Sequence, residues 1–346
     1  MKVLNRSRVI GRIAAPIAVG LCLLTSPLAH ADGASSLNAE LNAVGGYSDS
    51  DGCISEIRGS QRNSVGFEYF RKVANEYGDF LTFDLQARVS HDSSEPGGNA
   101  VGLEVHSAWA EYKLGLGRNL RFGHFSPAHG LEPVTDTHGT IQQTLAVQDV
   151  GFKKDWGVGY RGLLGPFDLS LAAQLGSGMG IQMRDGSFLL SAQVWEPPGN
   201  GFRYGLSVLA GRVLSSRGGW TLPSPGFGAA VVTKVRAGAA AAFESGSFEI
   251  KGELSAGKND DIGVAGALLD AAYVPPSLQN LTFEAQGRVW SGELGASDGL
   301  ASSITLGASY ELTRDWTLRA YLIHDLSGPG DTEDTSVVCQ VYFFGG

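Results

Sequence analysis

One stretch of the chain concentrates side chains that could do chemistry. From Gly123 to Leu145 the sequence reads GHFSPAHGLEPVTDTHGTIQQTL, with three of the seven histidines beside Glu132 and Asp136. Histidine and carboxylate side chains are common metal ligands and common general acids and bases. The three histidines are spaced five and nine residues apart, which fits no standard zinc motif. A metal site is therefore kept only as an alternative. The reason why this stretch is polar has to come from the organisation of the rest of the chain.

The first 31 residues are typical of a cleaved secretory signal peptide. A basic start precedes an apolar run over residues 13–24, and the small-x-small triplet Ala29-His30-Ala31 follows. The apolar run is shorter than the roughly 20 residues of a membrane-spanning helix. Removal of this segment, with its four basic residues, takes the formal charge from −9 to −13. Such an excess of negative charge argues against nucleic acid as a partner.

The mature chain repeats an apolar residue at every second position. Residues 80–90 read FLTFDLQARVS, and the same alternation occurs in 248–256, 281–290 and 304–312. A period of two is typical of β-strands with one apolar and one polar face. Each segment has the nine to eleven residues that a tilted strand needs to cross a bilayer. No long stretch keeps the helical period, and the 49 glycines are about twice the ordinary share.

Sixteen strands follow from this pattern, within a range of fourteen to eighteen. We predict them at residues 36–47, 64–74, 79–90, 102–116, 119–126, 151–164, 166–176, 187–196, 201–213, 230–243, 247–257, 263–274, 280–291, 302–313, 315–325 and 335–344. Short connections alternate with mostly longer ones, as in outer-membrane barrels with short periplasmic turns and long external loops. Closure satisfies every backbone hydrogen bond inside lipid. The sequence therefore predicts an all-β fold, a closed antiparallel transmembrane β-barrel over residues 32–346. A secreted sandwich or solenoid is the alternative.

Two segments resemble Gram-negative outer-membrane porins, of the general and phosphate-selective kind. The closing strand ends in the aromatic Phe344, although Gly345 and Gly346 follow it. The run Arg121-Phe122-Gly123-His124-Phe125, then a proline, a glycine and an acidic residue, is similar to a segment of several porin families. The resemblance implies an outer-membrane location and a homotrimer. It also implies that the longest connection, residues 127–150, folds into the lumen.

A segment inside a water-filled barrel must be polar, and its acids would face bases on the wall. The resulting transverse field orients permeating solutes and sets ion preference. The candidate pore-lining residues are Glu132, Asp136, His129 and His138 on the connection, with Arg88, Arg121, Arg161, Lys234, Arg236, Arg288 and Arg319 on the wall. The alternative is that many of them pair with one another across the wall.

Cys53 and Cys339 are the two cysteines of the mature chain. They are too few for a disulfide scaffold or a zinc framework. Cys53 falls in the first external loop and Cys339 in the last strand, and first and last strands are neighbours in a closed barrel. One disulfide between them is therefore an alternative to two free thiols.

The function that fits these features is passive diffusion of small hydrophilic solutes or ions, with no cofactor. The expected partners are outer-membrane lipid, lipopolysaccharide and the solutes themselves. A structural barrel, either a sheath around a partner protein or an adhesin, is the first alternative. An outer-membrane enzyme is the second, since Gly176-Ser177-Gly178 only loosely resembles a nucleophile elbow and lacks the strand-turn-helix context.

Overall fold

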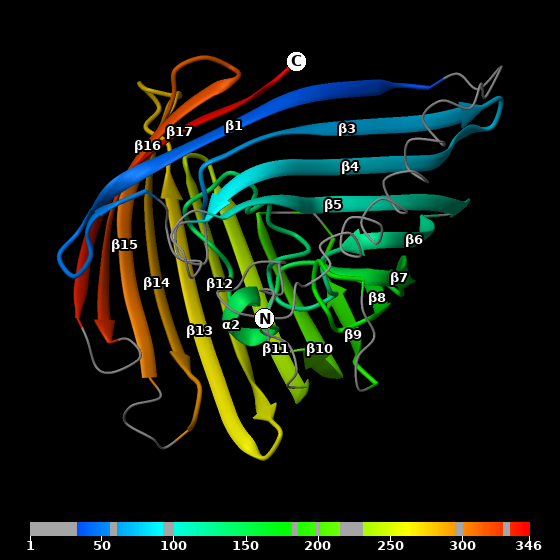
Figure 1. Cartoon of the computed structure of the whole chain (residues 1–346). Coiled ribbons are helices and arrows are strands. Elements are labelled where there is room, and N and C mark those ends of the chain that lie inside the picture. Colours follow the sequence, from blue (N-terminus) through cyan, green and yellow to red (C-terminus); the bar gives the residue numbers. More distant parts are fainter. Residues whose placement is uncertain are drawn as a thin grey trace, which may run out of the picture.

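A single closed sheet of sixteen long strands forms the body of the molecule (Figure 1). The computed structural model describes residues 33–55, 61–92, 100–115, 117–181, 186–197, 199, 201–214, 231–294, 300–327 and 333–346. The predicted signal peptide, residues 1–31, lies outside them. The long strands are β1 (Ser35–Ser48), β3 (Ser64–Asn75), β4 (Gly78–Asp92), β5 (Ala100–Gly115), β6 (Arg118–Phe125), β7 (Asp155–Leu164), β8 (Phe167–Gln174), β9 (Phe188–Trp195), β10 (Phe202–Leu214), β11 (Val231–Ser245), β12 (Phe248–Asn259), β13 (Ile262–Tyr273), β14 (Leu281–Ser291), β15 (Leu300–Glu311), β16 (Trp316–Ser327) and β17 (Asp334–Gly345). A three-residue strand, β2 (Gly52–Ile54), folds back on β1.

Each strand pairs antiparallel with its neighbours in the chain, and β1 pairs with β17 to close the ring. The closing register runs from Ala39 opposite Gly345 to Ser48 opposite Ser336. The predicted all-β barrel of sixteen strands is therefore confirmed. Most boundaries differ by no more than two residues, and the largest difference is at β7, which begins at Asp155 and not at residue 151. Residues 151–154 continue the preceding connection, where Phe152 and Lys153 are buried.

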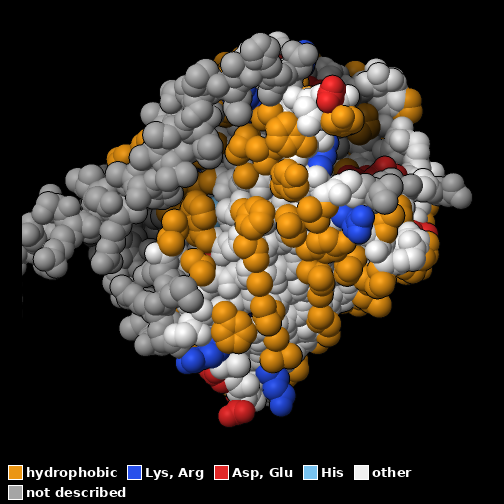
Figure 2. Space-filling view, turned by 90° about the vertical axis from the view of Figure 1, so that its right-hand side faces the viewer, with side chains coloured by type: hydrophobic (Ala, Val, Ile, Leu, Met, Phe, Trp, Pro, Cys, Tyr) orange, Lys and Arg blue, Asp and Glu red, His pale blue; other side chains and the backbone are white. Residues whose placement is uncertain are grey.

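The two faces of the sheet have opposite chemistry, and the apolar face points outward. Leu254 is 61% exposed, whereas Glu253 and Ser255 on either side of it are each 3% exposed. The same inversion recurs along β10 and β17. Figure 2 shows hydrophobic side chains over the middle of the visible outer face, with charged side chains at its lower edge and in its upper part. This arrangement matches a barrel whose outside contacts hydrocarbon and whose inside contacts water.

Aromatic pairs gather at the end of the barrel that carries the short turns. Phe248 at the start of β12 stacks on Tyr273 at the end of β13, with ring centroids 4.6 Å apart. Trp316 at the start of β16 lies 4.8 Å from Phe343 near the end of β17. Aromatic rings suit the boundary between hydrocarbon and headgroups. The short-turn end therefore carries the girdle expected at one membrane surface.

Within the described part of the chain, no helix has the length and apolarity to cross a bilayer.

A charge placed on the middle of the outward face should destabilise the barrel in lipid. We expect Leu254→Arg to cost about 2–4 kcal/mol, because it puts an arginine near the bilayer midplane. Ile262→Arg, on an outward residue at the strand end, should cost about 0–1 kcal/mol. Guanidinium titrations of folding into phosphatidylcholine vesicles measure both values, and equal costs would contradict the assigned orientation.

Candidate functional site

Residues 126–154, between β6 and β7, form the longest connection of the barrel and lie against the inner face of its wall. They include the short helix α2 (Ala146–Asp149) (Figure 1). Hydrogen bonds join this segment to two separate parts of the wall. One part is formed by β9 to β12, and the other by β1, β4, β16 and β17.

The first attachment begins directly after β6. The backbone amide of Ala128 donates to the Ser191 hydroxyl at 2.8 Å, and that of Gly130 donates to the Ser207 hydroxyl at 3.2 Å. The Gln193 side chain donates to the Gly130 carbonyl at 2.6 Å. Gly130 has φ +65°, and a Cβ there would meet the Glu253 carboxylate. A glycine is therefore required where the chain turns onto β9, β10 and β12.

A fully buried charged cluster fixes the other end of the same attachment. The Asp149 carboxylate accepts from Arg236 Nε at 2.6 Å and lies 2.8 Å from His129 Nε2. Burial by itself raises the pKa of Asp149, yet His129, the Ser255 hydroxyl and the Arg236 guanidinium hold it below its ordinary value. Lys234 donates to the Val150 carbonyl at 2.7 Å. The negative charge of Asp149 is thus matched by Arg236 on the wall and by His129 within the segment.

The second attachment holds the tip of the segment. The Gly139 carbonyl accepts from Arg319 Nη1 at 2.7 Å and from Gln340 Nε2 at 3.1 Å. The Gln61 side chain donates to the Thr140 carbonyl at 2.5 Å. Gly139 has φ +66°, and a Cβ there would meet the Tyr342 ring. The tip therefore fits closely against β17 and takes donors from β16 and β17.

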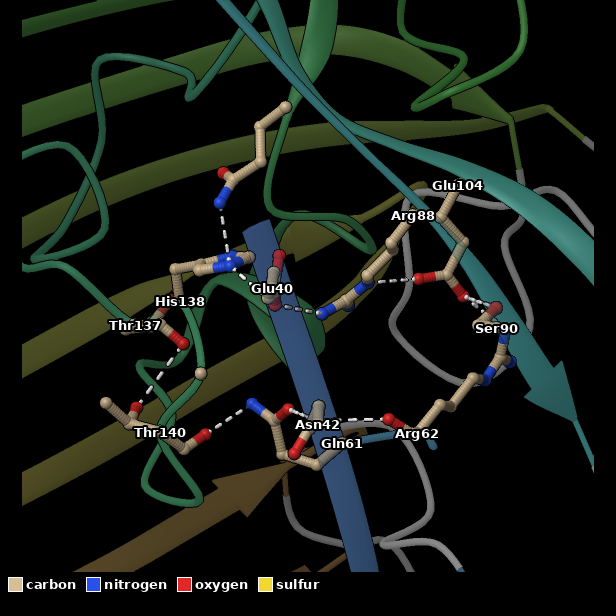
Figure 3. Close-up of polar contacts among 12 residues, drawn as sticks. Glu40, Asn42, Gln61, Arg62, Arg88, Ser90, Glu104, Thr137, His138 and Thr140 are labelled. Atoms are coloured by element: carbon tan, nitrogen blue, oxygen red, sulfur yellow. Dashed lines mark hydrogen bonds and ion pairs between the residues drawn. The ribbon is translucent and has the colours of Figure 1, made fainter. Parts of the chain in front are cut away.

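His138 joins the tip to a chain of ion pairs on the wall, drawn in Figure 3. Its Nε2 atom lies 2.8 Å from Glu40 Oε1 and 2.7 Å from Gln86 Nε2. Glu40 is 3.7 Å from Arg88, whose Nε donates to Glu104 at 2.7 Å. Glu104 also accepts from Ser90 and from Arg62, at 2.7 and 2.9 Å. Acidic and basic side chains alternate along this series of ion pairs, which limits the cost of desolvating them.

Bonds within the segment keep its two limbs together. Glu132 accepts from the hydroxyls of Thr137 at 3.0 Å and Thr144 at 2.6 Å. Lys153 is buried and donates to Thr137 and to Gln143. Burial lowers the pKa of Lys153 to about 8, against the opposing effect of the Glu132 carboxylate. The acid at 132 and the base at 153 therefore act inside the segment.

The predicted pore-lining residues separate into paired and solvent-facing groups. Those in ion pairs or bonded to backbone carbonyls are Arg88, Arg121, Lys234, Arg236 and Arg319, with His129 and His138, whereas Glu132 accepts from two hydroxyls of its own segment. Arg121 pairs with Glu111 at 2.6 Å and lies 4.0 Å over the Trp109 ring. Asp136 and Arg161 are exposed, and Arg288 is half-buried. Arg88 and Arg121 pair with carboxylates of the wall itself, and Arg236 and His138 pair across the space between the segment and the wall.

Open space remains between the segment and the wall. Two cavities of about 330 and 100 Å³ share the lining residues Leu131, Thr135, Asp136, Glu249 and Lys251. Sequence reasoning missed the charged residues that complete the lining, namely Arg203, Glu244, Glu249, Lys251, Asp270 and Glu284. The sequence could have indicated these residues, because each falls at an inward position in the alternation of β10 to β14.

The three histidines of the polar stretch lie in different surroundings. His124 is fully buried 5.1 Å from the Trp156 ring, whereas His129 contacts Asp149 and His138 contacts Glu40. Among the residues that the structure describes, no three His, Cys, Asp or Glu side chains form a group that could hold a metal ion. Ser177 donates to the Gly180 carbonyl, and its backbone amide contacts Asp155.

Cys53 and Cys339 are both exposed free thiols. Cys53 lies opposite Tyr47 on one edge of β1, and Cys339 lies opposite Gly45 on the other edge. The two are thus about two strand spacings, or roughly 9–10 Å, apart. Cα atoms more than about 7 Å apart cannot be bridged without backbone movement. The disulfide considered from the sequence is not formed here.

Comparison with solved structures places this barrel among known ones. The anion-selective porin from Comamonas acidovorans aligns with a TM-score of 0.64 at 13% identity, covering 90% of this chain and 100% of that chain. The chain has the porin fold. OprB of Pseudomonas putida aligns over 90% of this chain and 94% of that chain, with a TM-score of 0.60 and 12% identity. OmpF of Salmonella typhi, in complex with daunomycin, gives a TM-score of 0.60 and 10% identity over 90% and 97%.

The porin fold is the extent of these likenesses, since all the identities are low. No protein-family model matches the sequence. No curated protein matches it either.

Removal of the Asp149 charge should loosen the segment from the wall. In Asp149→Asn the buried Arg236 loses its counter-ion, and breaking a buried pair costs about 3 kcal/mol or more. The amides of α2 should then exchange with deuterium about a hundredfold faster, as measured by mass spectrometry of the detergent-solubilised protein. Glu249→Gln breaks a partly exposed pair with Lys251 and should leave this exchange unchanged. Unchanged exchange in Asp149→Asn would mean that Asp149 does not hold the segment.

Proposed function

We propose that this chain is a passive outer-membrane channel for small hydrophilic solutes or ions, in which residues 126–154 form the constriction. The observation that supports this most directly is the attachment of one polar segment to two separate parts of the inner wall. A segment that is attached to the wall at two places narrows the lumen at a fixed depth in the barrel. Water and solutes then pass beside it, under the field of the charges that face the remaining space.

The size and chemistry of the barrel favour a channel. Rings of sixteen to eighteen strands leave an aqueous interior, whereas eight-stranded rings are filled by side chains. The inward face here is polar, and cavities remain between it and the segment. The solved neighbours carry the names porin and outer-membrane channel, the latter being DcaP of Acinetobacter baumannii, with 12% identity and a TM-score of 0.57.

Location and assembly follow from the same proposal. Residues 1–31 would direct export and be removed, and the apolar outer face would then enter the outer membrane beside lipopolysaccharide. The homotrimer implied by resemblance to general porins belongs to the proposal as well. Passage needs no covalent step, no cofactor and no energy input.

The purified mature chain should form ohmic channels. Added from detergent to a planar lipid bilayer in 1 M KCl, it should give stepwise increases of current that scale with voltage. A barrel that sheathed a partner protein would conduct unusually well, or fail to fold, in the absence of that partner. A well-folded protein that inserts and conducts no current would overturn the proposal.

Displacement of the tip of the segment should disturb the current. Gly139→Val puts a side chain at φ +66° against the Tyr342 ring, so the tip must leave β17. We expect a different single-channel conductance with more frequent fluctuations, recorded in the same bilayers. Gly165→Val is the matched control, because Gly165 has φ +61° in the turn between β7 and β8 with open space around it. Identical currents in the wild type and Gly139→Val would exclude the tip from the permeation path.

A further inference from the structure

We infer that the passage between the segment and the wall of β9 to β14 selects cationic solutes, including small organic amines. This inference rests on the proposed channel function and adds its substrate class. Three independent observations carry it. They are the charges that line the passage, the pairing of the basic residues elsewhere on the wall, and an unsatisfied carboxylate oxygen at the passage.

The lining of the two adjoining cavities is acidic. The larger cavity has Asp136, Glu244 and Glu249 against Arg203 and Lys251. The smaller one adds Asp270 and Glu284 to the shared Asp136, Glu249 and Lys251. Five carboxylates therefore face two cations, a formal excess of three negative charges.

Both cations of the lining are already engaged. Lys251 Nζ lies 2.9 Å from Glu249 Oε1. Arg203 donates to the Glu196 carbonyl at 3.4 Å and its guanidinium lies 5.7 Å over the Trp195 ring. Neither position leaves a cation that dominates the passage. An anion would meet five carboxylates with only Arg203 and Lys251 to offset them.

The basic residues outside the passage do not reverse this balance. Arg236 is paired with Asp149, Arg88 with Glu104, and Arg121 with Glu111. Arg319 is bonded to the Gly139 carbonyl on the side of the segment that faces β16 and β17. Arg161 and Arg288 line neither cavity. Arg236 and Arg319 therefore hold the segment, Arg88 and Arg121 pair with carboxylates of the wall itself, and Arg161 and Arg288 lie outside both cavities, whose lining keeps its acidic excess.

Asp270 supplies the observation that points to a ligand. Its Oδ1 atom is buried and has no hydrogen-bond partner among the described residues, although the side chain lines the smaller cavity. A buried carboxylate oxygen without a donor is costly unless water or a cation fills that place. An ammonium group is a donor of the required charge and carries three N–H bonds.

The apolar part of the lining extends the inference from inorganic ions to organic amines. Leu131, Val134 and Trp195 line the larger cavity, and Leu268 lines the smaller one. A solute with a carbon skeleton and an ammonium group can place the first against these side chains and the second against the carboxylates.

Electrostatic arithmetic gives the expected size of the effect. One net charge at about 6 Å in water changes the population of a monovalent ion about threefold. Screening by salt reduces this, so the preference should be strongest at low ionic strength. With an excess of three charges we expect the permeability to K⁺ to exceed that to Cl⁻ by at least about threefold in dilute KCl.

The test is the reversal potential of the mature protein in planar bilayers across a tenfold KCl gradient, from 10 to 100 mM. The expected result is cation preference. The variant Asp136→Asn/Glu249→Gln/Asp270→Asn removes the three-charge excess and should bring the permeability ratio to about one. The matched control, Asp49→Asn/Asp51→Asn/Asp261→Asn, removes three exposed carboxylates from external connections and should keep the cation preference. Swelling of liposomes in arginine hydrochloride should also exceed swelling in potassium glutamate.

The outcomes separate this inference from the proposed function. Channels that conduct with a preference for Cl⁻, or with none, would overturn the inference and leave the channel function intact. Cation preference that survives in the triple variant would overturn the assignment to this passage. A protein that gives no current contradicts the channel itself.

Discussion

Every other feature of this structure depends on closing one sheet, so that no strand edge meets lipid. An unpaired backbone amide or carbonyl in hydrocarbon costs several kcal/mol, and a closed ring of strands removes all of them at once. The pairing of β1 with β17 over ten register positions is therefore the interaction that permits the rest. Once the ring is closed, alternation along each strand assigns one face to lipid and the other to the interior.

Closure creates a second problem, which is an interior lined by polar side chains that need partners. The segment between β6 and β7 supplies many of these partners. Arg236, Lys234, Arg319 and Gln340 all donate to the segment. Replacement of a buried ion pair by apolar residues is often neutral or stabilising, so pairs such as Arg236–Asp149 are weak evidence for stability. Their better-supported contribution is to register, because Asp149 can satisfy Arg236 at one position of the segment only.

The sequence predicted the barrel well because its strands are set by a local pattern. Leu254 between Glu253 and Ser255 needs no long-range information to be placed outward, and all sixteen long strands were found in this way. The start of β7 was missed because Phe152 and Lys153 continue a plausible strand pattern, while their burial depends on contacts with the rest of the segment. The sequence could not decide whether Cys53 and Cys339 form a disulfide, for a similar reason. Neighbouring strands were inferred correctly, but the position of Cys53 on the far edge of β1 depends on β2, a three-residue strand that no periodicity reveals.

At the candidate site, the alternation of residues along the strands no longer predicts which side chains contact one another. Alternation gives the face on which Arg88, Arg236 and Lys251 lie, and it gives the same answer for all three. It says nothing about which of them meets a carboxylate from a segment more than eighty residues away, as Arg236 meets Asp149. The charges that face solvent are those left over after such pairing, so they can be identified only once the barrel is assembled. For this reason Arg236 and Arg319, predicted from the sequence to line the pore, hold the segment in place, while Asp270, an ordinary inward residue of β13, has an unpaired oxygen beside the open space.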